Sequence, residues 1–151
     1  MKWLLMAHIL GVTVWVGGMF FAYMALRPAS VELLETPERL ILWNGVLRRF
    51  LSWVWVTVLL ILASGLGMIM LLGGFAKVLW PIHLMFVLGV IMMLIFGHVY
   101  FAGYARLKRY VAGREWPAAG KALIQIRMFI GMNLIIGLVT IVIATLGSMH
   151  H

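Results

Sequence analysis

The chain has 151 residues, of which 65% are hydrophobic, and its mean hydropathy is +1.10. Soluble globular domains contain about 45–50% apolar residues, so this composition excludes a soluble fold and indicates one integral membrane domain over residues 1–151. The net charge is +8, and no cysteine is present. Disulfides and thiolate ligands are therefore excluded, and a metal would be held by His, Met or oxygen ligands.

Four uncharged apolar runs are each long enough to cross the hydrocarbon core as a helix. They cover residues 3–26, 50–76, 78–105 and 128–147. The sequence therefore predicts an all-α fold, an integral membrane four-helix bundle. The first run begins almost at Met1 and lacks an Ala-x-Ala exit, so we interpret it as a span and not as a cleaved signal peptide.

The first run contains an ionisable side chain, His8. An imidazole inside a membrane has few partners in lipid and marks a candidate site. One face of the predicted helix combines this His with a Trp and three small residues: His8, Gly11, Trp15, Gly18 and Ala22. Arg27-Pro28 is expected to end this helix, because the residue before a proline is disfavoured in the helical region.

Proline signals place the starts of the later helices. Thr36-Pro37-Glu38 predicts that the second helix begins near Pro37 and extends over residues 37–49 before its apolar run. Gly73-Gly74 breaks the chain, and Trp80-Pro81 opens the third helix, which is expected to stop at Gly113. The fourth helix starts at Trp116-Pro117, so residues 106–127 form a second extension outside the apolar runs. Along the fourth helix, small and polar residues form a stripe typical of tight helix packing: Asn133, Gly137, Thr140, Ala144 and Gly147.

The basic residues are distributed unequally between the two ends of the predicted bundle. Ten of the twelve lie on the side of the first and third loops: Arg27, Arg39, Arg48, Arg49, Arg106, Lys108, Arg109, Arg114, Lys121 and Arg127. Only Lys2 and Lys77 lie on the other side. The positive-inside rule makes the loop side cytoplasmic and puts both termini outside. The basic residues are then expected to set the orientation in the membrane and to contact anionic lipid. The lipid bilayer is therefore the expected partner, and nucleic acid is not.

Two histidines lie at matching depth. His8 and His83 each follow the start of their apolar run by five residues, about 7 Å along helices that run in the same direction. Two imidazoles at the same depth in one bundle favour bis-His ligation of haem b. The sequence therefore predicts a role in electron transfer. In that interpretation Gly11, Gly18 and Gly65 leave room for the macrocycle, and Trp15 and Phe86 cover it. The alternative is that each His is a hydrogen-bonded packing residue.

His98 lies fifteen residues after His83, about 22 Å along the third helix and near the predicted cytoplasmic side. A second haem there would need mixed ligation, with candidates at a similar level on the first and fourth helices: Tyr23, Met24, Met128 and Met132.

Copper is the competing interpretation. Thioether and imidazole ligands suit copper, and four methionines share the outer half with His8 and His83: Met6, Met68, Met70 and Met85.

A haem protein would exchange electrons with a quinone or a periplasmic redox partner, and a homo-oligomer is a further candidate assembly. His150 and His151 follow a Gly-Ser junction typical of expression tags, so they are left out of the prediction.

Several motifs resemble the copper resistance D (CopD) family, in its small stand-alone form. They are residues 8–21, with Trp15 and Gly17-Gly18, and residues 26–28, 48–50, 64–67 and 94–100. The resemblance covers most of the chain and implies copper uptake or handling at the bacterial inner membrane, as a multi-pass protein.

The His-Trp-Gly opening and the His at the start of the third helix more distantly resemble HemJ-type protoporphyrinogen oxidases, four-helix proteins that bind haem b. That resemblance implies His8 and His83 as the family histidines. Those oxidases have a Lys just after the third-helix His, whereas Leu84 follows His83 here, a departure that concerns oxidase activity and not haem binding. The sequence thus predicts a haem b protein, leaving open whether it is a membrane oxidoreductase. The alternatives are copper handling without haem and a structural subunit of a membrane complex.

Overall fold

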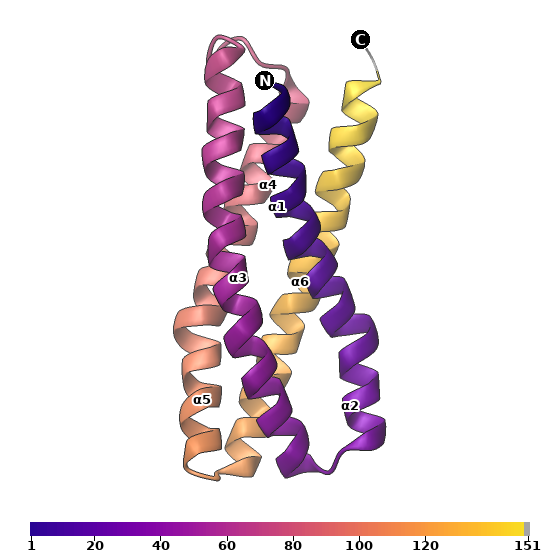
Figure 1. Cartoon of the computed structure of the whole chain (residues 1–151), viewed down its shortest axis with the longest axis vertical. Coiled ribbons are helices and arrows are strands. Elements are labelled where there is room, and N and C mark those ends of the chain that lie inside the picture. The colour runs from indigo at the N-terminus through magenta and orange to yellow at the C-terminus, as the bar shows by residue number, and fades with distance from the viewer. Residues whose placement is uncertain (150–151) are drawn as a thin grey trace.

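The computed structural model describes residues 1–149, which contain helices and turns and no strand. The structure has four long helical rods, which run along the length of the molecule (Figure 1). The first consists of α1 (Lys2–Phe21), the π-helical turn η1 (Ala22–Leu26) and α2 (Arg27–Leu33), and the second is α3 (Thr36–Leu71). The third consists of α4 (Trp80–His98), the π-helical segment η2 (Val99–Tyr104) and α5 (Ala105–Ala112), and the fourth is α6 (Trp116–Ser148).

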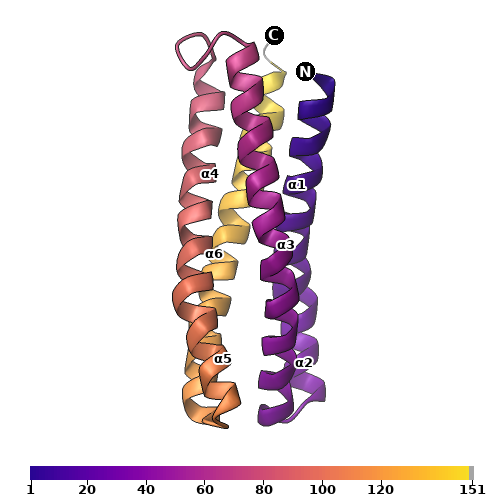
Figure 2. The same cartoon turned by 60° about the vertical axis from the view of Figure 1, so that its left-hand side comes forward.

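The rods alternate in direction, so the N-terminus and the end of α6 lie at the same end of the bundle (Figure 1). We call it the termini end, and the end with the α2–α3 and α5–α6 turns the loop end. All four rods are long and apolar enough to cross a membrane, which confirms the predicted four-helix bundle. In Figure 2, α1 and α4 lie on opposite sides, with α3 and α6 between them. The contacts agree, because α1 packs on α3 and α6 whereas α4 packs mainly on α6.

The first helix does not end at Arg27-Pro28, and that prediction was wrong. The helix widens into a π-turn at η1, where the Arg27 amide donates to the Ala22 carbonyl five residues earlier. Proline has no N–H, and its ring clashes with the carbonyl four residues before it in a regular helix. A wider turn just before Pro28 relieves that conflict, so the helix continues to Leu33.

The other local signals placed the boundaries well. α3 begins at Thr36, α4 at Trp80 and α6 at Trp116, as predicted, and α5 ends at Ala112 beside Gly113. α3 ends at Leu71, five residues before its apolar run does, because the next turn uses Gly73 and Gly74 at φ +99° and +88°. Those dihedrals are open to glycine and costly for other residues.

The bundle is apolar both inside and outside. Trp43, Leu47, Val54, Leu107 and Ile126 are almost fully buried. Large apolar side chains also cover the outer faces, as expected of helices that face lipid.

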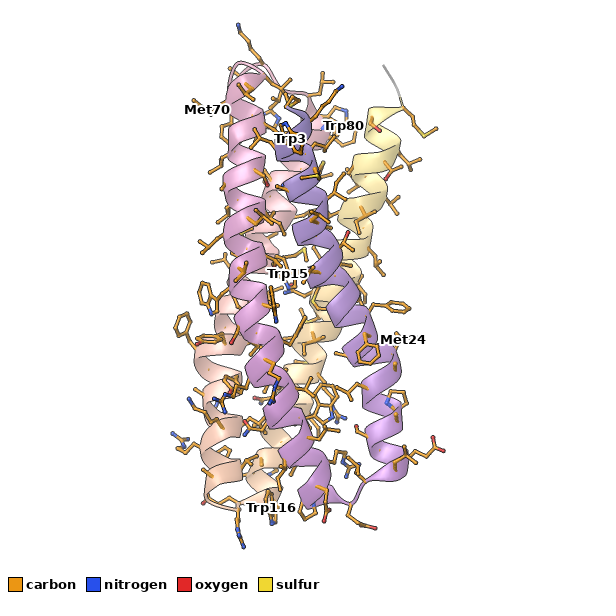
Figure 3. The ribbon with its side chains drawn as sticks, viewed as in Figure 1. Trp3, Trp15, Met24, Met70, Trp80 and Trp116 are labelled. Carbon is orange, nitrogen blue, oxygen red and sulfur yellow. The ribbon has the colours of Figure 1, made fainter. Side chains whose placement is uncertain are left out.

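Tryptophans mark both ends of the bundle. Trp3 and Trp80 are 77% and 71% exposed at the termini end, and Trp116 lies at the loop end (Figure 3). Tryptophan is enriched at membrane interfaces, so these positions fit a multi-pass membrane protein.

Candidate functional site

The half-buried imidazole of His8 faces α3. Its Nδ1 lies 3.1 Å from Ser64 Oγ and 3.2 Å from the carbonyl oxygen of Ile61. Ser64 Oγ itself donates to the Leu60 carbonyl at 2.5 Å, so its only proton is used within α3. Both neighbours of Nδ1 are therefore acceptors. The tautomer of neutral His8 with its proton on Nδ1 matches these two acceptors, and in that tautomer the Nε2 lone pair is available to a metal.

Gly65 lets the imidazole lie against α3. A Cβ at this position would stand 3.2 Å from His8 Cε1, closer than most side-chain contacts. Two residues toward the termini end, a Cβ at Gly67 would meet Leu4 at 3.2 Å. The small residues Gly65 and Gly67 therefore let α1 approach this end of α3 closely.

The two glycines of α1 are packed on protein side chains as well. A Cβ at Gly11 would lie 2.8 Å from Ile61 Cγ1, and a Cβ at Gly18 would collide with the ring of Phe50. The space above Gly11, Gly18 and Gly65, which the sequence assigned to a macrocycle, is thus filled by Ile61, Phe50 and His8.

His83 occupies a different environment from His8. It is exposed on the first turns of α4, and its Nδ1 lies 3.2 Å from the Leu79 carbonyl of its own chain segment. The nearby aromatic ring is Phe75, in the α3–α4 turn, with ring centroids 6.1 Å apart. Phe86 packs on that same ring at 5.1 Å and does not cover a slot beside His8. As in His8, a carbonyl acceptor at Nδ1 leaves Nε2 free.

His98 stands apart from both. It is exposed on the last residue of α4, where its ring meets the edge of Phe129 at 5.1 Å between centroids. Tyr23, a candidate second ligand at that level, packs instead over Gly131 and under the guanidinium of Arg27. The side chain of Tyr23 is therefore engaged with α6 and Arg27.

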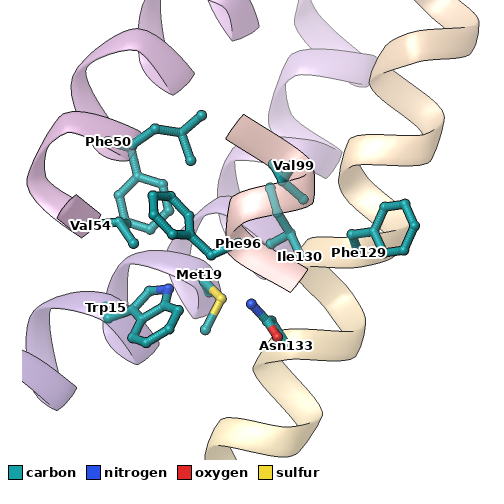
Figure 4. A pocket seen from close by; sticks show the side chains of 10 residues that line it. Trp15, Met19, Phe50, Val54, Phe96, Val99, Phe129, Ile130 and Asn133 are labelled. Carbon is teal, nitrogen blue, oxygen red and sulfur yellow. The ribbon is translucent and has the colours of Figure 1, made fainter. Parts of the chain in front are cut away.

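Trp15 contributes to an aromatic cluster in the middle of the bundle. It packs edge-on to Phe96, with ring centroids 6.2 Å apart, and Phe96 meets Trp55 at 5.0 Å. Trp15 also lines a small cavity where the four rods meet, together with Met19 and Asn133 (Figure 4). The space open to the centre of a water molecule there is about 20 Å³. That is room for about one water, too little for a cofactor.

Asn133 is the polar residue of this cavity, 3% exposed on α6. Its Nδ2 donates to the Met92 carbonyl at 3.1 Å, whereas its Oδ1 is buried without a hydrogen-bond partner. The sequence indicated packing for Asn133, and the hydrogen bond from α6 to α4 fits that prediction.

Bis-His ligation of haem requires both imidazoles to face one slot between α1 and α4. Here His8 is hydrogen-bonded to α3, His83 lies beside Phe75, and α1 and α4 sit across the bundle from each other. The residues as arranged do not fit a haem at that place, and haem b stays a prediction.

No group of three His, Cys, Asp or Glu side chains comes together within residues 1–149, so a metal here would need methionine or a low coordination number.

Sequence reasoning missed two neighbours of the histidines, Ser64 and Phe75. Ser64 was considered only as part of the motif at residues 64–67, although its position in a long apolar run was a signal that its hydroxyl serves a partner. Phe75 lies in a turn, and no periodic pattern predicts which side chain a turn residue will reach.

Comparison with known proteins gives a result at the level of the family. No curated protein and no solved structure matches the chain. The family described as copper resistance protein D matches residues 44–146, from the first turns of α3 almost to the end of α6. That match covers more than half of the chain and includes Ser64, Gly65, His83 and His98. The chain therefore belongs to the copper resistance protein D family.

Proposed function

We propose that this protein handles copper at the membrane and that His8 is a copper ligand near the termini end. The observation that carries the proposal is the position of His8 Nδ1, 3.2 Å from the Ile61 carbonyl and 3.1 Å from Ser64 Oγ. Donation from Nδ1 to these acceptors would orient the ring and leave Nε2 unprotonated. A metal-binding His typically donates its second ring N–H to a carbonyl or another acceptor, and this partner sets both the tautomer and the ring orientation.

Methionine and a second histidine would complete the copper site. Thioether and imidazole groups suit copper(I), and the chain offers no thiolate. Met68 lies one helical turn beyond Ser64 on the same face of α3, toward the termini end. Met6 and Met85 belong to the same half of the bundle, as does His83, whose exposed Nε2 suits the first capture of an ion. The copper is cargo in this proposal, held in transit.

The direction of handling depends on orientation. With the basic loop end in the cytoplasm of a bacterium, the termini end and His8 face the periplasmic side of the inner membrane. The ten-to-two charge asymmetry supports this orientation. Copper would then meet the protein from outside, as uptake requires.

The test is copper(I) binding by the purified full-length protein, measured by competition with a chromogenic chelator. His150 and His151 are replaced in every sample, so that the tail imidazoles do not contribute. We expect about one copper per chain, lost in His8→Ala and retained in His98→Ala, a matched control for removing an imidazole. Unchanged binding in His8→Ala would contradict the proposal. An absorption spectrum of the same samples separates the alternative, because a Soret band that needs His8 and His83 would favour haem b.

A further inference from the structure

A cleft between α5 and α6 at the loop end carries a second inference. Its space for water centres is about 150 Å³, far more than the roughly 10–15 Å³ that one water needs. Two cations, a phenol and an amide line it above a floor of small side chains: Arg106, Tyr110, Ala118, Lys121, Ala122 and Gln125. No carboxylate is among these lining residues.

Helical spacing explains why these groups converge. Arg106 and Tyr110 are four residues apart on α5, so they share one face. Lys121 and Gln125 have the same relation on α6. The two alanines beside them keep the backbone close and leave the space open, because their side chains are a single methyl group. The cleft is therefore built from two helix faces that both offer hydrogen-bond donors.

Two contacts hold the donors in place. Arg106 Nε donates to the Ala102 carbonyl at 3.2 Å, which directs the guanidinium and leaves its two terminal NH2 groups for a ligand. The Arg109 guanidinium lies 5.1 Å from the centre of the Tyr110 ring, which braces the phenol from the side. A guanidinium, an ammonium and a hydroxyl together suit the oxygens of a phosphate group.

The depth of the cleft identifies the source of that phosphate. Arg106 is the first residue after the apolar run 78–105, and Gln125 and Lys121 precede the run at Met128 by three and seven residues. At 1.5 Å per residue the cleft extends from the hydrocarbon boundary to about 10 Å beyond it. Lipid headgroups occupy about the first 5–8 Å of this layer, since a bilayer is about 40–45 Å thick around a core of about 30 Å.

We propose that the Arg106–Lys121 cleft binds a phosphate group, and that an anionic phospholipid supplies it. This inference does not depend on copper handling, because it concerns the opposite end of the bundle. A bound headgroup here would connect α5 to α6 and anchor the loop end at the membrane surface.

The experiment uses the full-length protein in detergent, titrated with short-chain phosphatidylglycerol, short-chain phosphatidylcholine or inorganic phosphate. Native mass spectrometry counts retained lipids. The test variant is Arg106→Gln with Lys121→Gln, and the matched control is Arg48→Gln with Lys108→Gln, which removes one Arg and one Lys exposed at the same end but outside the cleft. Circular dichroism checks that the helices of both variants persist.

We expect one retained phosphatidylglycerol in the unmodified protein and in the control. The test variant should bind it roughly 30-fold more weakly, about fivefold for each basic residue lost. Cleft-dependent binding of inorganic phosphate that competes with the lipid supports the phosphate site and assigns a soluble source as well. An equal loss in both variants, equal retention of phosphatidylcholine, or no anion bound by the unmodified protein would overturn the proposal.

Discussion

The contact of Gly18 with Phe50 gives a sharp prediction about the α1–α3 interface. A Cβ added at Gly18 would collide with Cε2 of the Phe50 ring and lie 2.9 Å from its Cζ. The ring is rigid, so it cannot yield in the way that the end of an aliphatic chain can. The neighbouring Gly17 is exposed on the outside of the bundle, and no atom beyond its chain neighbours and its own stretch of helix backbone lies within 4 Å of the Cβ it would gain.

These two glycines form a matched pair, because both lie in the middle of α1 and differ in what they face. Replacing a helical glycine by alanine gains about 0.8–1.0 kcal/mol of helix propensity in aqueous hosts, and the gain should be similar at both positions. Overpacking a well-filled interface costs about 1–3 kcal/mol. Gly18→Ala should therefore be less stable than Gly17→Ala by about 1–3 kcal/mol.

The assay is unfolding in mixed micelles by titration with sodium dodecyl sulfate, followed by circular dichroism. Combining Gly18→Ala with Phe50→Leu should recover part of the loss, because the smaller side chain makes room for the methyl group, and the double-mutant cycle measures this coupling. Equal stability of Gly18→Ala and Gly17→Ala would refute the packing assignment. It would also reopen the possibility that the face of Gly18 lines a slot for a planar cofactor.

Three further predictions concern other parts of the chain. Ser64→Ala should weaken copper binding at His8 by about tenfold, since loss of an outer-shell hydrogen-bond partner typically costs 10- to 100-fold, whereas Ser52→Ala on the exposed side of α3 should leave the chelator competition unchanged. Asn133→Leu should change the free energy of unfolding by less than about 1 kcal/mol, because the partnerless Oδ1 disappears with the hydrogen bond; a loss above about 2 kcal/mol would reveal a partner for that oxygen. Reporter fusions at Gly113 and at the C-terminus should report cytoplasmic and periplasmic locations, and reversed signals would invert the proposed orientation.

The sequence predicted the parts of the fold that depend on local chemistry. α3, α4 and α6 each begin with a proline in the first turn. Proline is favoured there because the first N–H groups of a helix have no intrahelical partner, so its missing N–H costs nothing. The turn at Gly73 and Gly74 follows from dihedrals that other residues avoid. Pro28 was misread for the same reason, since the local rule does not foresee a π-turn that makes room for the ring.

The candidate site was predicted less well because it depends on which helices become neighbours. Helical periodicity correctly grouped His8 with Gly11, Trp15 and Gly18, and these residues face the interior or a neighbouring helix. Periodicity and depth place His8 and His83 in the same half of the bundle, but neither fixes the order of helices around its axis. That order puts α3, and not α4, against the His8 imidazole.

The same close approach that packs α1 on α3 also prepares His8 chemically. Gly65 admits the imidazole to the surface of α3, where the Ile61 carbonyl and Ser64 Oγ lie within hydrogen-bond distance of its Nδ1. If α1 were held further away, His8 would lose these acceptors, and either ring nitrogen could then carry the proton. The packing of α1 on α3 and the tautomer of His8 are therefore coupled at this interface. Gly65→Ala should displace the ring and so, at the proposed copper site, weaken copper(I) binding in the chelator competition even though no ligand atom has been removed.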